Sequence, residues 1–173
     1  MYIAPMRELC GLMLTWTTYG TWLHGDERGA YNRKGDTLKS HYVAPDPRLE
    51  DLHRRRMKDN AFILDAAMRK VVRLAIEECC AFRGWPALAL NVRTNHVHIV
   101  VPPHAKGQDM LHDLKARATR KLREAGLIAA KQSVWTRSGS VSRLYGEASV
   151  AKAIKYTKHG QGPDLPEAQQ PRL

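Results

Sequence analysis

The segment from residue 88 to 101 constrains the possible folds of this chain more than any other. It holds two short apolar stretches with the alternation of β-strands, separated only by Thr94-Asn95, which is a plausible tight turn. Helical periodicity precedes it over residues 60–83 and follows it over residues 107–125. A strand hairpin placed between two helices predicts an antiparallel sheet with helices packed on it.

The remaining segments predict the other elements of the fold. A strand is expected from Leu9 to Tyr19, a long connection poor in periodic signal over residues 20–57, and a strand or hairpin within 134–145. Asp59 or Asn60 is the expected cap of the first long helix.

With a last helix over residues 147–159, the order is β-α-β-β-α-β-α. This order predicts the α+β class and a ferredoxin-like split βαβ fold, with an antiparallel sheet of four or five strands and two helices on one face. Residues 1–162 are expected to form a single domain. The Pro- and Gln-rich segment 163–173 is expected to be a disordered tail.

The charge of the chain indicates its partner. Lys and Arg number 28 against 17 Asp and Glu, giving a net charge of +11. A protein with this positive charge attracts polyanions, so nucleic acid is the first partner to consider and an acidic membrane surface is the second. No apolar stretch approaches the roughly 20 residues that span a bilayer, so no membrane partner is expected.

The three cysteines, Cys10, Cys79 and Cys80, form no CxxC pair. They indicate a reducing cytosol and no structural zinc.

The strand from His96 to Val101 begins with two histidines on the same side, since side chains alternate across a strand. Two imidazoles at this spacing can bind one divalent cation. They can equally be a solvated or hydrogen-bonded pair, and the H-x-H pattern alone does not decide. The third alternate position is Val100, which argues against a histidine-triad hydrolase.

Tyr156 is the best placed of six tyrosines to act with the histidines. It lies in the last helix, about 200° around the axis from the apolar Ile154, and Lys152, Lys155 and Lys158 surround it. A phenol can attack a phosphodiester and form a covalent phosphotyrosine. The alternative is an amphipathic tyrosine at the rim of a packed helix.

Four segments together resemble a known family. They are 14-LTWTTYGTWLHGDERG-29, 94-TNHVHIVV-101, 135-WTRSGS-140 and 153-AIKYTKHGQG-162. Their order resembles that of the HUH single-tyrosine transposases, in particular the REP-associated tyrosine transposases and the insertion-sequence-200-like transposases. The resemblance extends from about Leu12 to Gly162.

The resemblance implies an enzyme that cleaves and rejoins single-stranded hairpin DNA. His96 and His98 would hold Mg²⁺ or Mn²⁺, and Tyr156 would be the nucleophile that forms a 5′-phosphotyrosine. Relatives usually place Gln or Asn one helical turn after the tyrosine as a third metal ligand. Here that position is Gly160, so the third ligand would be Gln161 or His159.

The resemblance and the charge together make several basic side chains candidates for contacts to DNA phosphates. These are Arg54, Arg55, Arg56, Lys115, Arg120, Lys152 and Lys155. A bacterial cytosolic or nucleoid location and a possible homodimer are expected. Gly160 also leaves open an alternative function, a domesticated relative that binds DNA or RNA hairpins with weakened catalysis.

Overall fold

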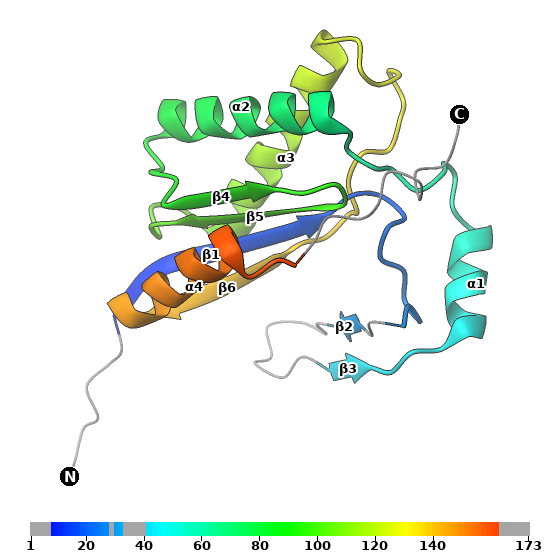
Figure 1. Ribbon diagram of the computed structural model, residues 1–173, viewed down its shortest axis with the longest axis horizontal. Helices are drawn as coiled ribbons and strands as arrows, with labels where there is room; N and C mark the ends of the chain where they lie inside the picture. The colour runs from blue at the N-terminus through cyan, green and yellow to red at the C-terminus, as the bar shows by residue number, and fades with distance from the viewer. Residues whose placement is uncertain (1–7, 28–29, 33–40, 163–173) are drawn as a thin grey trace.

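The computed structural model describes residues 8–27, 30–32 and 41–162 and consists of a sheet with helices on both faces (Figure 1). The elements in chain order are β1 (Leu9–Thr17), β2 (Ala30–Asn32), β3 (His41–Val43), α1 (Pro47–Arg55), α2 (Ala66–Arg83), β4 (Ala89–Val92), β5 (His96–Val101), α3 (Gly107–Glu124), β6 (Ser140–Tyr145) and α4 (Glu147–His159). The tail predicted to be disordered, residues 163–173, lies outside the described residues.

The main sheet has four strands in the order β4-β5-β1-β6, with every neighbouring pair antiparallel. This is the strand order of the ferredoxin-like split βαβ fold, which confirms the predicted class. Strands β2 and β3 form a separate two-stranded hairpin inside the long connection.

The two faces of the sheet are packed differently. Alternation along β1 turns Leu12, Leu14 and Trp16 to one face, where all three are buried among α2 and α3. The opposite face carries a smaller apolar cluster, in which Val100 packs with Ala153 of α4. Helix α4 therefore lies on the face that α2 and α3 leave free (Figure 1).

Helix α2 begins later than the sequence pattern predicts. Its cap is Asp65, whose carboxylate accepts a hydrogen bond from the Met68 amide, and neither Asp59 nor Asn60 caps it. The preceding residues are not helical, and the amides of Phe62 and Leu64 donate to the carbonyls of Tyr19 and Thr94 at 2.8 and 2.7 Å. Both side chains are buried, so core contacts and hydrogen bonds to distant residues override the local helical periodicity.

The long connection contains a helix that the sequence analysis did not expect. Asp46 caps α1 by accepting hydrogen bonds from the amides of Arg48 and Leu49, and Pro47 takes the first helical position. The sequence Asp46-Pro47 could have predicted the start of this helix, because Asp is favoured as an N-cap and Pro at the first helical position.

Within the described ranges, no helix has both the length and the apolarity needed to cross a bilayer. The three cysteines are free thiols, and Cys79 and Cys80 are buried in α2.

Candidate active site

The histidine pair lies on the α4 face of β5. His96 and His98 alternate with Val97 and Ile99, which are fully buried on the opposite face. The two imidazole rings are 4.8 Å apart between centroids and meet edge to face. The predicted placement of both rings on one side of the strand is therefore confirmed.

Each ring is held through its Nδ1 atom by a neighbouring polar side chain. His96 Nδ1 lies 2.7 Å from Asn95 Oδ1, and His98 Nδ1 lies 2.7 Å from Thr15 Oγ1. Thr15 is the register partner of His98 on β1. Histidines that bind metals are typically fixed in this way, because the second hydrogen bond sets the tautomer and leaves the other nitrogen free to ligate.

Gln161 is the third polar group beside this pair. Its Oε1 lies 3.2 Å from His96 Nε2, and its Nε2 donates to the Tyr156 carbonyl at 3.2 Å. His159 is exposed at the end of α4. Of the two candidates for a third ligand, Gln161 is the one that the structure brings to the histidines.

The donor and acceptor pattern at His96 fits a bound cation. Asn95 Oδ1 can only accept, so His96 Nδ1 carries a proton in this arrangement. His96 Nε2 faces the Gln161 carbonyl oxygen, which is also an acceptor, at 3.2 Å. With Nδ1 protonated, a neutral ring would present its lone pair at Nε2, and a cation between these two atoms would stabilise both. The described residues contain no group of three His, Cys, Asp or Glu side chains that could hold a metal, so the amide oxygen would complete the ligand set.

Tyr156 lies beside the histidine pair and remains open to solvent. Its ring centroid is 5.8 Å from that of His98, the two rings are tilted by 75°, and the residue is 47% exposed. Helix α4 is tied to the sheet where Asn91 Nδ2 donates to the Thr157 carbonyl at 2.8 Å. The structure thus brings together His96, His98, Tyr156 and Gln161 as the sequence analysis expected.

Gly160 allows this arrangement of the helix end. Its amide donates to the Tyr156 carbonyl at 2.8 Å, and a Cβ at this position would lie 2.6 Å from Tyr156 Cδ2. Any other residue would therefore displace the tyrosine ring or the chain end. Gln161, one residue later, is the residue whose amide oxygen lies beside His96.

The electrostatic environment keeps His98 neutral. Burial, reinforced by the neighbouring His96 and by Arg93, lowers the pKa of His98 to about 4, against a smaller opposing effect of Gln161. A neutral imidazole is the form that ligates a cation.

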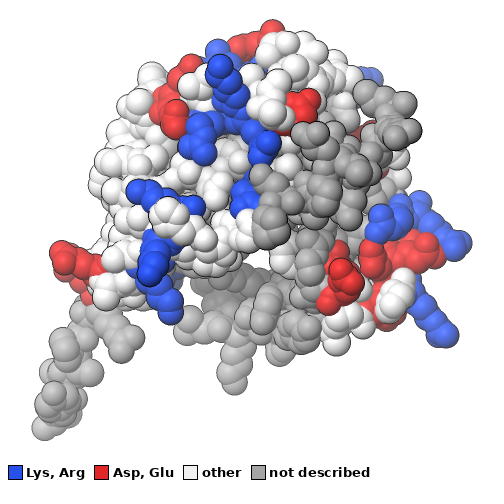
Figure 2. Space-filling model, viewed as in Figure 1, with Lys and Arg blue, Asp and Glu red and all other residues white. Residues whose placement is uncertain are grey.

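The predicted DNA-contact residues lie in different settings. Lys152 and Lys155 are exposed on α4, the helix of Tyr156, and Figure 2 shows basic side chains over this helix. Arg54 and Arg55 form ion pairs with Glu50 and Asp51 on α1, where Figure 2 shows both signs of charge mixed.

Arg56 is exposed at the end of α1, and Arg120 is exposed on α3. Lys115 instead turns toward the segment before β6, where its ammonium donates to the carbonyls of Thr136, Arg137 and Ser138. Burial lowers the pKa of Lys115.

Sequence reasoning missed the groups that hold the site residues in place. Thr15, Asn91 and Asn95 have no catalytic signature of their own, and Thr15 is 83 residues from its partner His98. Of these three residues, only Asn95 could have been identified from the sequence, since it directly precedes the histidine strand.

Comparison with known proteins identifies the family of this chain. The model of the family described as "Transposase IS200 like" matches residues 55–159, more than half of the chain. The chain belongs to the IS200-like transposase family, and the resemblance noted from the sequence is confirmed. A search among curated protein sequences finds no match.

Two solved structures are similar in fold. One is a REP-associated tyrosine transposase bound to a REP hairpin, with 10% identity and a TM-score of 0.49, covering 91% of this chain and 70% of that one. The other is a candidate transposase from Deinococcus radiodurans R1, with 15% identity and a TM-score of 0.43, covering 91% and 95%. The family membership rests on the family model and not on these likenesses.

The lowered pKa of His98 predicts a pH-dependent stability of the metal-free protein. A histidine with a folded pKa of about 4 and an ordinary value of 6.5 is neutral when folded, whereas the unfolded chain takes up the proton first. The contribution of neutral His98 to the free energy of unfolding is fully present above pH 6.5 and is lost as the pH falls toward 4, by up to about 3 kcal/mol.

Urea unfolding of chelator-treated protein across this pH window measures the loss. His98→Gln should flatten the curve and His104→Gln should not. Parallel curves for the wild type and His98→Gln would contradict the assignment.

Proposed function

We propose that this chain is a transposase enzyme that cleaves and rejoins single-stranded hairpin DNA through a covalent 5′-phosphotyrosine. The observation that carries the proposal is the position of the Tyr156 ring, 5.8 Å from His98, on the side of the sheet where His96 Nε2 faces Gln161 Oε1. The net charge of +11 supports a nucleic-acid substrate. The hairpin form of that substrate follows from the resemblance to the family.

The nucleophile is the phenol oxygen of Tyr156. It attacks the scissile phosphorus and loses its proton to solvent, and a new bond joins the tyrosine to the 5′ side of the break. The bond from phosphorus to the 3′ oxygen breaks, and that oxygen leaves as a 3′-hydroxyl after taking a proton. Attack by a 3′-hydroxyl on the phosphotyrosine reverses the step and rejoins DNA, so no external energy source is required.

His96, His98 and Gln161 are the proposed ligands of a divalent metal, Mg²⁺ or Mn²⁺. A cation at this position supplies Lewis-acid stabilisation of the charge that develops on the phosphate oxygens. Asn95 and Thr15 hold the two imidazoles in position through their Nδ1 atoms. Lys152 and Lys155, which lie on the helix of Tyr156, are proposed to bind backbone phosphates near the break.

A covalent adduct is the direct test of the enzyme. Purified protein incubated with a panel of hairpin oligonucleotides and Mn²⁺ should yield a protein–DNA band on a denaturing gel. Tyr156→Phe should abolish it because the attacking oxygen is absent. Tyr145→Phe is the matched control, since this exposed phenol lies on β6 outside the site.

The adduct experiment also separates the two candidate functions. Tight hairpin binding by the wild type without an adduct on any substrate would support the alternative, a domesticated hairpin-binding protein. An adduct that persists in Tyr156→Phe would show that another residue is the nucleophile.

Metal binding can be measured without DNA. Titration of Mn²⁺ followed by electron paramagnetic resonance should show one bound ion in the wild type and none in His96→Ala. Thr15→Val should weaken binding by about 10- to 100-fold, because it removes the hydrogen bond that orients His98. His104→Gln is the control. Equal Mn²⁺ affinity in wild type and His96→Ala would remove the metal from the proposal.

Gly160 is expected to control the rate of adduct formation. A methyl group at this position meets the Tyr156 ring, so Gly160→Ala should slow adduct formation by up to about 100-fold while the DNA affinity stays unchanged. Gly126→Ala controls for lost stability alone: this glycine also follows a helix and has a φ of +68°, where alanine is strained, but its added Cβ would contact nothing within 4 Å. An unchanged rate in Gly160→Ala would show that the contact does not position the nucleophile.

A further inference from the structure

The hairpin that joins β4 to β5 places an arginine directly opposite the first histidine of the candidate site. Val92 pairs with Val97 in the antiparallel register, so the next pair along the hairpin is Arg93 and His96. The Arg93 amide supports this pairing, because it donates to the His96 carbonyl at 2.8 Å. Side chains of directly opposed residues lie on the same face of a sheet, with Cβ atoms roughly 4.5–5.5 Å apart. Arg93 therefore lies on the face of the histidine pair.

The alternation of side chains along β4 gives the same placement. Val92 packs in the large core under α2 and α3, whereas Ala89 packs in the small cluster with α4. Asn91 also faces α4, since its amide donates to the Thr157 carbonyl. Arg93 follows these two residues at the same two-residue spacing and is half-buried. It continues the set of side chains on the α4 face.

The turn that follows Arg93 is held by hydrogen bonds from distant parts of the chain. Thr18 donates to the Asn95 carbonyl through its amide at 2.8 Å and through its hydroxyl at 3.2 Å. The Leu64 amide donates to the Thr94 carbonyl at 2.7 Å. Both turn residues are buried. The backbone of Arg93 is therefore fixed relative to the histidines, which lowers the ordering cost of a contact made by its side chain.

The positive charge of Arg93 acts on the histidine pair. Burial is the main cause of the lowered pKa of His98 and the neighbouring His96 is the second, and Arg93 shifts this pKa in the same direction. A fixed positive charge therefore lies beside the proposed metal ligands. It repels a cation bound by the histidines, and an anion that contacts both charges removes this repulsion. The site as a whole is thus suited to a cation and an anion bound together.

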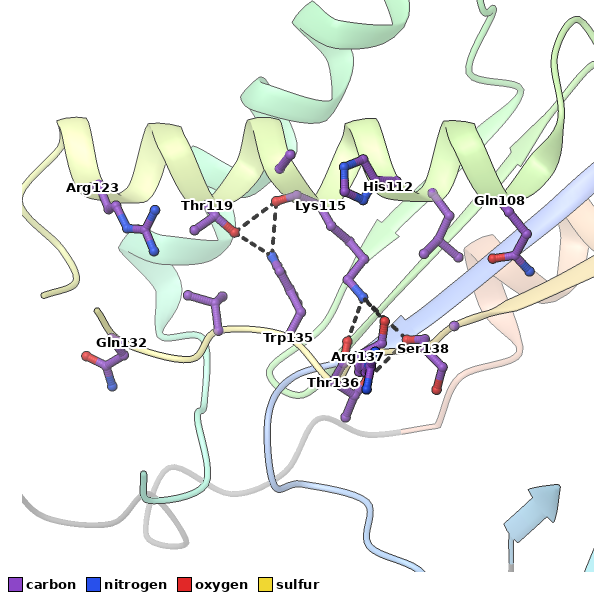
Figure 3. Close-up of a pocket in the computed structure, with 14 residues that line it drawn as sticks. Gln108, His112, Lys115, Thr119, Arg123, Gln132, Trp135, Thr136, Arg137 and Ser138 are labelled. Atoms are coloured by element: carbon purple, nitrogen blue, oxygen red, sulfur yellow. Dashed lines mark hydrogen bonds between the residues drawn. The ribbon is translucent and has the colours of Figure 1, made fainter. Parts of the chain in front are cut away.

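The other basic side chains considered for DNA contacts are held differently. Lys152 and Lys155 are exposed on α4, a helix with few buried residues. Lys115 lies on α3, which packs against the opposite face of the sheet, and its ammonium donates to backbone carbonyls of the segment before β6 (Figure 3). Arg93 differs from all three because it is carried by the hairpin of the histidine strand itself.

An arginine at this position is suited to a phosphodiester. The guanidinium presents five N–H donors in a planar fork and keeps its charge at every pH at which the protein is folded. Two of these donors can bind the non-bridging oxygens of one phosphate. Hydrogen bonds between charged partners are roughly twice as strong as those between neutral groups. The negative charge of the phosphate also offsets the repulsion between the guanidinium and a bound cation.

We propose that Arg93 is a catalytic residue that donates hydrogen bonds to the non-bridging oxygens of the scissile phosphate. The inference rests on the proposed function and adds a residue to the same site. The guanidinium transfers no proton, because it stays protonated throughout, and it stabilises the charge on the phosphate while Tyr156 attacks. Arg93 should therefore weaken metal binding when DNA is absent and strengthen it when the phosphate is bound.

The first test measures the affinity for Mn²⁺ by electron paramagnetic resonance, without and with the hairpin oligonucleotide that the protein binds most tightly. A Tyr156→Phe background prevents cleavage, and a further His96→Ala variant measures the Mn²⁺ that the DNA itself binds. Without DNA, Arg93→Ala should bind Mn²⁺ about 2- to 5-fold more tightly, because a positive charge beside the ion is removed. The hairpin should raise the Mn²⁺ affinity of the parent by roughly 10-fold, and Arg93→Ala should lose most of this gain.

The second test measures the rate of adduct formation with Tyr156 present. At saturating DNA and Mn²⁺, Arg93→Ala should be slower by about 100-fold or more, the usual cost of removing a donor to a developing charge. Arg93→Lys keeps the charge without the planar fork, so its rate should be intermediate and its Mn²⁺ affinity without DNA unchanged. Arg143→Ala is the matched control, since this exposed arginine on β6 pairs with Leu12 on the opposite face of the sheet.

Several outcomes would overturn the inference. They are a hairpin that leaves the Mn²⁺ affinity of the parent unchanged, an Arg93→Ala variant that keeps the full gain, and one whose Mn²⁺ affinity without DNA does not rise. A wild type that forms no adduct would refute the proposed cleavage, and the Mn²⁺ titrations would still decide the phosphate contact. An adduct formed at the normal rate by Arg93→Ala would overturn this inference and leave the proposed function standing.

Discussion

The antiparallel register between β1 and β5 determines where the polar groups of the site lie. It sets Thr15 opposite His98 and Thr17 opposite His96. The first pairing supplies the hydroxyl that holds the His98 ring, and the second joins the histidine strand, through Thr136, to the segment before β6. A slip of one residue would turn these side chains to the opposite face and bring Leu14 and Trp16 out of the core. The buried face of β1 therefore stabilises the register on which the histidine site depends.

Several features of this structure follow from local sequence. Strand β5 was predicted with its observed bounds because Pro102 ends it and a turn precedes it, and α4 was predicted because its apolar positions recur at helical spacing. Alternation alone placed His96 and His98 together. The match of the family model to residues 55–159 then confirmed the resemblance carried by the quoted segments.

Other features depend on contacts distant in sequence. Helix α2 begins at Ala66 and not at residue 60 or 61, because Phe62 and Leu64 are buried in a non-helical segment, which helical periodicity cannot reveal. Thr15 became part of the site only through strand pairing. The position of Gln161 depends on how the chain leaves α4 at Gly160, and spacing on an ideal helix could not decide between it and His159. The metal and nucleophile roles of these residues remain predictions.

The unequal packing of the two faces gives the helix of Tyr156 less buried apolar contact than the strand of the histidines. Strand β5 belongs to the large core under α2 and α3, whereas α4 buries only Ala153 and Thr157 on its own small cluster. Elements with few buried apolar contacts open at a lower free energy than the core of the same domain. Helix α4 is therefore expected to open at a lower free energy than β5, which would carry Tyr156 away from the histidines while the large core stays closed.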